Sequence, residues 1–127
     1  MQKGILIIDF GSQYTQLIAR RVREQSVYCE IHPFNKITKK LINGLNPSGI
    51  ILSGGPNSVL NQKSPKLPFL VENSNLPILG ICYGLQLLSL VHKGKIKKSS
   101  SREYGFAKIK VSQNSKIIPK EWINKNT

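Results

Sequence analysis

The chain has 127 residues, 19 Lys and Arg, 6 Asp and Glu, and a formal net charge of +13. This length predicts one domain with a modest core, or a part of a larger protein. The positive charge is mostly lysine, lies scattered along the chain and has no interleaved aromatic residues, which argues against a nucleic-acid partner.

The cysteines and the apolar runs indicate the compartment. Two cysteines are too few for a disulfide scaffold, so Cys29 and Cys82 are expected to be free thiols in a reducing environment. No apolar run approaches the ~20 residues that a membrane span requires, and the first run is too short for a signal peptide. We therefore expect a cytoplasmic protein without membrane contact.

The first part of the chain alternates between strand and helix patterns. The apolar run GILIIDF, residues 4–10, predicts a strand that is covered on both faces. Ser12 is a candidate N-cap for a helix over residues 13–25, in which the apolar side chains share one face. The segment VYCEI predicts a second strand at residues 27–31.

The same alternation continues as far as Val91. A short helix, ITKKLINGL, which Gly44 is expected to close, leads to a third apolar strand, SGIILSG. Residues 54–68 predict a loop, and LPILGI predicts a fourth strand that runs into a helix from Tyr83 to Val91. Residues 94–112 then alternate apolar and polar side chains, as in a hairpin or a sheet edge. This order predicts an α/β fold with an open, mostly parallel sheet and helices on both faces.

A G-x-C-x-G motif, from Gly80 to Gly84, joins the fourth strand to its helix and places Cys82 at the turn. This is the pattern of a nucleophile elbow with cysteine in place of serine. The glycines prevent collisions around a strained turn, and the helix N-terminus brings N–H groups and positive potential to the sulfur. The alternative is a small buried cysteine, a role that fits Cys29 better because no glycines flank it. The motif therefore favours Cys82 as a nucleophile.

A second glycine pair, Gly54 and Gly55, closes the third strand. There it would let the backbone approach a ligand closely, at the sheet edge where open α/β folds bind ligands. A pyrophosphatase-type nucleotide loop is the alternative, but Pro56 and Asn57 replace its small residue and its acid, and no G-x-x-x-x-G-K-[ST] motif occurs. Because the third and fourth strands are expected to be neighbours, we interpret the N–H groups of Gly55 and Tyr83 as an oxyanion hole.

Four segments together resemble a known family: IDFGSQYTQLIARRVRE, GIILSGGPNSV, GICYGLQLL and REYGFA. They are similar to the class I glutamine amidotransferase domain of glutamine-hydrolysing GMP synthases. The first segment is the most specific, since other class I amidotransferases share the cysteine elbow but usually lack that opening. The resemblance covers essentially the whole chain and implies that residues 1–127 are a partial flavodoxin-like domain, incomplete at its C-terminus.

The resemblance also implies roles for individual residues. Cys82 would form a glutamyl thioester, with Gly55 and Tyr83 as its oxyanion-hole donors. Gly54 and Gln86 would bind the substrate, and the role of Gln86 rests on the resemblance alone. The implied partners are L-glutamine and a synthetase domain or subunit, of the ATP-pyrophosphatase type, that aminates XMP to GMP.

The resemblance implies neither a cofactor nor a metal for the glutaminase domain. In the family, ATP and Mg²⁺ belong to the synthetase domain. The 127 residues contain no counterpart of that domain or of the dimerisation domain. The glutaminase chemistry itself would rest on protein side chains and backbone groups.

The base that cysteine chemistry on an amide requires is not evident. His32, expected in a surface loop before Pro33, and His92 are the two histidines of the sequence. His92 follows Cys82 by ten residues on the same predicted helix, which places it ~15 Å away at ~1.5 Å rise per residue. The S-H-G-D and H-P-E type motifs of the family are absent, so the resemblance implies truncation before the catalytic histidine and glutamate. We therefore expect the chain alone to be inactive.

Two other interpretations stay open. One is a decayed or repurposed non-catalytic subunit that binds a synthetase partner. The other is an unrelated cysteine hydrolase of the DJ-1 type, whose fold is also flavodoxin-like. The segments DFGSQY and SGGP argue against the second of these interpretations.

Overall fold

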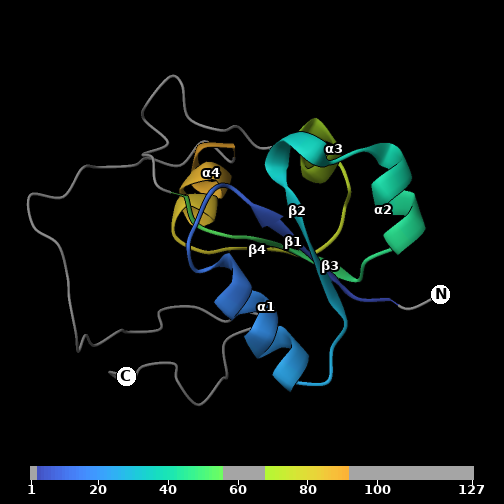
Figure 1. The fold of residues 1–127 in the computed structure, drawn as a ribbon. Coiled ribbons are helices and arrows are strands. Elements are labelled where there is room, and N and C mark those ends of the chain that lie inside the picture. The colour runs from blue at the N-terminus through green and yellow to red at the C-terminus, as the bar shows by residue number, and fades with distance from the viewer. Residues whose placement is uncertain (1–2, 56–67, 92–127) are drawn as a thin grey trace, which may run out of the picture. The chain divides into compact units, whose positions relative to one another are not determined.

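The computed structural model describes residues 3–55 and 68–91, which belong to one compact unit, residues 1–96 (Figure 1). Within these ranges four parallel strands form one sheet in the order β2-β1-β3-β4. The strands are β1 (Ile5–Asp9), β2 (Cys29–Pro33), β3 (Gly49–Leu52) and β4 (Ile78–Gly80). The predicted open parallel sheet is confirmed, as is the expectation that the third and fourth strands are neighbours.

Helices lie between successive strands, because a parallel pair cannot be joined by a tight hairpin. The helix α1 (Thr15–Glu24) follows β1, and β2 leads through the 3-10 turn η1 (Phe34–Lys36) into α2 (Lys39–Leu45). The short helix α3 (Phe69–Glu72) precedes β4, and α4 (Tyr83–Val91) follows it. The sequence pattern did not predict α3, since its 4 residues are too few to show a helical period.

The helices cover both faces of the sheet, as predicted. Figure 1 shows α1 on one side of the strands and α2, α3 and α4 on the other. Because side chains alternate across a strand, neighbours in β1 enter different cores. Ile7 packs with Ala19 of α1 and with Cys29. Leu6 and Ile8 enter the larger core, whose other buried members are Phe10, Leu45, Ile50, Leu52, Val71, Tyr83 and Leu87.

Two helix ends differ from the prediction. Tyr14, and not Ser12, occupies the N-cap position of α1, and the cap makes no side-chain hydrogen bond. Ser12 Oγ instead accepts a hydrogen bond from Tyr14 N over 3.0 Å, which forms a turn ahead of the helix. In α2, Gly44 lies inside the helix, and Asn46 ends it in the left-handed conformation at φ 49°. Asparagine tolerates that conformation better than most residues do.

Some predictions fall outside the described residues. These are the hairpin over residues 94–112, the position of His92, and most of the loop over residues 54–68. In the ranges 3–55 and 68–91, no helix is long and apolar enough to cross a bilayer. The carboxyl ends of all four strands lie within these ranges, and the candidate site is built there.

Candidate active site

Cys82 occupies the turn between β4, which ends at Gly80, and α4, which begins at Tyr83. Its backbone has a φ of 53°, in the left-handed region that side chains rarely adopt. This conformation costs a non-glycine residue roughly 1–2 kcal/mol. The residue is exposed. The structure thus contains the strained, accessible turn that the G-x-C-x-G motif predicts.

Hydrogen bonds and close packing hold this turn against the end of β3. Ile81 N donates to Leu52 O over 2.9 Å, which extends the pairing of β3 and β4 by one residue. Gln86 N donates to Cys82 O over 3.2 Å and begins the helical bonding of α4. Gly84 lies so close to β3 that a Cβ atom there would overlap the Leu52 carbonyl group. The second glycine of the motif therefore serves the contact between α4 and β3.

A cavity of about 410 Å³ opens beside Cys82. Its walls come from the elbow turn, from the start of α1 and from the loops that follow β1 and β3. The carboxyl ends of parallel strands are where open α/β sheets bind ligands. The described lining residues are Gly11, Ser12, Gln13, Tyr14, Ile18, Gly54, Gly55, Ile81 and Cys82. The structure therefore brings together three of the predicted site residues, Gly54, Gly55 and Cys82.

The loop after β3 approaches the elbow closely. A Cβ atom on Gly54 would lie 3.3 Å from the Cys82 Cβ and 3.5 Å from Ser12 Oγ. A larger residue at position 54 would therefore crowd the thiol and narrow the cavity. Ser53, directly before Gly54, has a fully buried side chain, so this loop is anchored from behind.

Tyr83 and Gln86 lie in the first turns of α4 and are not among the described residues that line the cavity. The Tyr83 ring is buried and packs against Phe10, with the ring centroids 5.5 Å apart. Its backbone nitrogen directly follows Cys82. Gln86 is half-buried, and its Oε1 atom is enclosed without a hydrogen-bond partner in the described part of the chain. A buried amide oxygen without a donor costs free energy.

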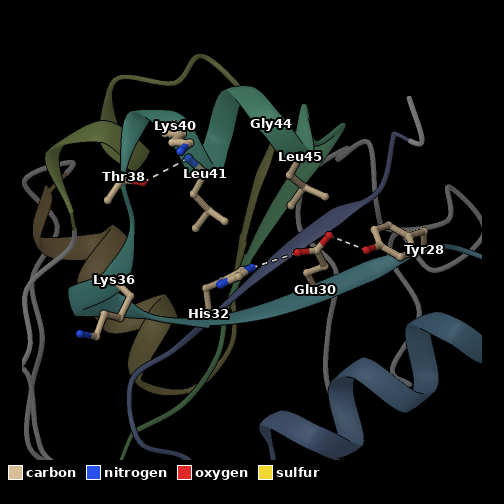
Figure 2. A pocket seen from close by; sticks show the side chains of 9 residues that line it. All are labelled: Tyr28, Glu30, His32, Lys36, Thr38, Lys40, Leu41, Gly44 and Leu45. Carbon is tan, nitrogen blue, oxygen red and sulfur yellow. Dashed lines mark hydrogen bonds and ion pairs between the residues drawn. The ribbon is translucent and has the colours of Figure 1, made fainter.

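His32 lies in a different cavity. It is part of β2, and not of the expected surface loop, because the strand pairs with β1 as far as Pro33. Its Nε2 atom lies 3.1 Å from Glu30 Oε1, and the Tyr28 hydroxyl donates to the other carboxylate oxygen. Figure 2 shows the side chains of Tyr28, which directly precedes β2, and of Glu30 and His32 in a row that faces α2. The cavity that these residues help to line has a volume of about 660 Å³.

Tyr28 and His32 both interact with the carboxylate of Glu30, which lies between them. The Tyr28 hydroxyl, and then the His32 ring, hold the pKa of Glu30 below its usual value by hydrogen bonding to the carboxylate. The same hydrogen bond raises the pKa of Tyr28. None of the three residues lines the Cys82 cavity. Within the described residues, therefore, no histidine is placed beside the thiol.

The second cysteine has a structural position. Cys29 is 2% exposed, and its Sγ lies 3.5 Å from Ala19 O, under α1. It has neither the accessibility nor the strained backbone of Cys82. The sequence-based distinction between a structural Cys29 and an elbow Cys82 agrees with these positions.

The sequence patterns missed one wall of the cavity, the loop after β1. Asp9 Oδ1 accepts hydrogen bonds from Gly11 N over 2.8 Å and from Ser12 N over 3.2 Å, and thereby turns the chain at the strand end. Gly11 adopts a φ of 98°, which suits glycine. An aspartate followed two residues later by glycine is a turn signal, because the carboxylate can accept hydrogen bonds from the backbone that follows it. That signal marks this wall in the sequence.

Comparison of the sequence with known proteins shows the family to which the chain belongs. The family model described as "Glutamine amidotransferase class-I" matches residues 6–126. The chain belongs to the class I glutamine amidotransferase family. This membership covers nearly the whole chain, agrees with the parallel sheet and its helices, and leaves the DJ-1-type alternative without support.

Several curated relatives of this amidotransferase chain carry the name "GMP synthase [glutamine-hydrolyzing]". The relative from Photorhabdus laumondii is 51% identical over 117 residues, which are 92% of this chain and 22% of the relative. The relative from Pseudomonas putida is 53% identical over 114 residues, or 90% of this chain and 22% of the relative. The chain thus spans about a fifth of the length of these relatives.

Proposed function

We propose that this chain is the glutamine-hydrolysing part of a GMP synthase, which supplies ammonia for the ATP-dependent amination of XMP to GMP. The relatives named GMP synthase, about half identical to this chain, support the proposal. According to this proposal, residues 1–127 form part of the glutaminase domain, and the protein acts in the cytoplasm. The partner is a synthetase domain or subunit of the ATP-pyrophosphatase type, and ATP and Mg²⁺ serve that partner.

The proposed reaction begins with attack by the Cys82 sulfur on the carboxamide carbon of glutamine. A C–S bond forms, and the N–H groups of Gly55 and Tyr83 stabilise the negative charge that develops on the carbonyl oxygen. The C–N bond then breaks, and the nitrogen leaves as ammonia after accepting a proton. Water hydrolyses the thioester to glutamate and restores the thiol. The proton donor and the base are proposed to come from outside the described residues, in which no histidine lines the cavity.

Substrate recognition is proposed to use backbone and amide groups. Gly54 allows the substrate to approach the loop after β3 closely, because a side chain there would crowd Cys82. The proposed substrate-binding role of Gln86 rests on the family resemblance, because its enclosed Oε1 atom does not line the cavity. Neither role requires a cofactor.

The observation that carries this proposal is the position of Cys82. An exposed cysteine in a left-handed conformation, beside a cavity with glycines in its walls, is a costly arrangement for stability alone. Nucleophilic attack on a small substrate gives a reason for that cost. Membership in the class I glutamine amidotransferase family supports glutamine as the proposed substrate.

The test is covalent labelling of the 127-residue chain with a chloroketone analogue of glutamine. The thiolate displaces chloride, a C–S bond forms and the adduct is located by peptide mass spectrometry. We expect Cys82 to react and Cys29 to stay free, and we expect glutamine to protect Cys82 much better than asparagine does. Cys82→Ser is the matched control and should not be labelled. Equal labelling of both cysteines would contradict the elbow assignment, and unprotected labelling would favour a non-catalytic subunit.

A further inference from the structure

A pair of buried hydroxyl groups lies directly behind the Cys82 cavity. Among the described residues, the core encloses two polar side chains, Thr15, which is 2% exposed, and Ser53, which is 0% exposed. Thr15 Oγ1 lies 3.0 Å from Ser53 Oγ, although the residues are 38 positions apart in the chain. Burying a hydroxyl group is costly unless it is hydrogen-bonded, and valine or alanine would fill the same space without that cost. The pair therefore requires an explanation.

Ser53 connects the pair to the loop after β3. Its Oγ lies 2.9 Å from Ile8 O, and its backbone N donates to the same oxygen over 3.0 Å. These contacts fasten the end of β3 to the end of β1, one residue before Gly54. A Cβ atom on Gly54 would lie 3.3 Å from the Cys82 Cβ, so a displacement of Ser53 moves the wall that faces the thiol.

Thr15 connects the same pair to the loop after β1. Its Oγ1 lies 3.1 Å from Asp9 Oδ1 and 3.3 Å from Ser12 O. The same Asp9 oxygen accepts hydrogen bonds from Gly11 N and Ser12 N, and both of these residues line the cavity. Thr15 therefore touches both the carboxylate and the backbone that shape this second wall.

The hydroxyl of Thr15 is the junction between the two walls. A hydroxyl group has one proton and two acceptor lone pairs. Thr15 therefore bonds both walls at once when it donates to Asp9 Oδ1 and accepts the proton of Ser53 Oγ, which lies 3.0 Å away. In that arrangement Ser53 N keeps the hydrogen bond to Ile8 O. Removal of the Thr15 hydroxyl would leave Asp9 and Ser53 without this shared partner inside the protein.

We propose that Thr15 is a positioning residue for the Cys82 site, because its hydroxyl holds the loops after β1 and β3 at a fixed separation around the thiol. This inference rests on the proposed function, since it concerns how glutamine is oriented for attack. Thr15 itself does not line the cavity. A small misplacement of a bound substrate can reduce the rate of attack by up to about 100-fold. An electrophile that the cavity walls do not orient should react with Cys82 at nearly the same rate whether or not the Thr15 hydroxyl is present.

The test compares two electrophiles on the full 127-residue chain and on its variants. The chloroketone analogue of glutamine requires both walls, whereas iodoacetamide requires only an accessible thiol. We expect Thr15→Val to slow chloroketone labelling of Cys82 by about tenfold or more, while iodoacetamide labelling changes by less than about threefold. Thr15→Ser keeps the hydroxyl and should retain the chloroketone rate. Ser53→Ala removes the other member of the pair and should reproduce the selective loss.

Each outcome distinguishes the inference from the proposed function. If the unchanged chain shows no glutamine-protected chloroketone labelling, the proposed function fails, and the inference fails with it. If that labelling is present but Thr15→Val keeps the ratio of the two rates, the positioning role alone is wrong. A parallel fall with both electrophiles would indicate a general loss of structure and also overturn the role. Should Thr15→Val fail to fold, as judged by circular dichroism, the rate ratio of Ser53→Ala decides the question.

Discussion

Among individual residues, Cys82 has the backbone conformation that is least favourable for its side chain in the elbow turn. Cys82 has a φ of 53°, a region in which glycine would be free of strain. The proposed thioester chemistry requires a thiol, so the proposed nucleophile keeps a side chain where the backbone conformation favours glycine. The surrounding hydrogen bonds, such as that from Ile81 N to Leu52 O, hold the turn in this conformation.

We predict that Cys82→Gly is more stable than Cys82→Ala by about 1 kcal/mol in free energy of unfolding. Both variants lack the thiol, but alanine keeps the Cβ atom and its strain, whereas glycine relieves it. The measurement is urea denaturation of the two variants under the same conditions. An alanine variant as stable as the glycine variant would show that the turn stores no strain.

At the element scale, the packing of α4 on β3 sets the direction of the elbow. Gly84 lies against the Leu52 carbonyl group, and Leu87, one turn later, is buried in the larger core. Because Gly84 and Leu87 hold α4 against β3 and the core, the first turn of the helix cannot shift relative to β3. The close contact therefore fixes the position of Cys82 relative to the loop after β3.

We predict that Gly84→Ala lowers the free energy of unfolding by about 1–3 kcal/mol, because the added methyl group would overlap β3. Gly44→Ala is the matched control, since a Cβ there has nothing within 4 Å and α2 should gain up to about 1 kcal/mol of helix propensity. The two variants share the same change in propensity, so thermal or urea unfolding isolates the packing effect. Equal effects of the two substitutions would contradict the close contact.

Across the described fold, the proposed nucleophile Cys82 and the described histidine line different cavities. Cys82 lines the cavity between the elbow and the loop after β1. His32 lines the cavity between β2 and α2, paired with Glu30 (Figure 2). Among the described residues, the proposed acylation step therefore has its thiol, whereas the proposed hydrolysis of the thioester has no histidine beside it to activate water.

We predict that the 127-residue chain mixed with glutamine forms at most one glutamyl thioester per chain, with no continuing release of ammonia. The thiol and the proposed N–H donors would permit acylation, whereas no histidine in residues 3–55 and 68–91 lines the cavity to activate water. Rapid-quench mass spectrometry detects the thioester, and an ammonia assay measures turnover. A fusion that continues this chain with the rest of the Photorhabdus laumondii relative should restore turnover. Sustained turnover by the 127 residues would mean that a base within the chain reaches Cys82.

Local patterns in the sequence were enough to predict the buried strand and the elbow turn. The continuous apolar run around Leu6 to Ile8 predicted a strand buried on both faces, because each side chain must enter one of two cores. The spacing of Gly80, Cys82 and Gly84 predicted the strained turn, because few residues other than glycine fit around such a backbone. Periodicity and glycine spacing involve only a few neighbouring residues, so the sequence alone contains them.

Contacts between residues far apart in the chain became visible only in the folded structure. It placed His32 in β2 beside Glu30, because pairing with β1 extends the strand beyond its apolar pattern. It brought Thr15 against Ser53 across 38 positions and thereby joined the two walls of the Cys82 cavity. Such contacts depend on the order of strands in the sheet and on the helices that cover it. No local pattern encodes that order, because each strand pairs with partners that lie far away in the chain.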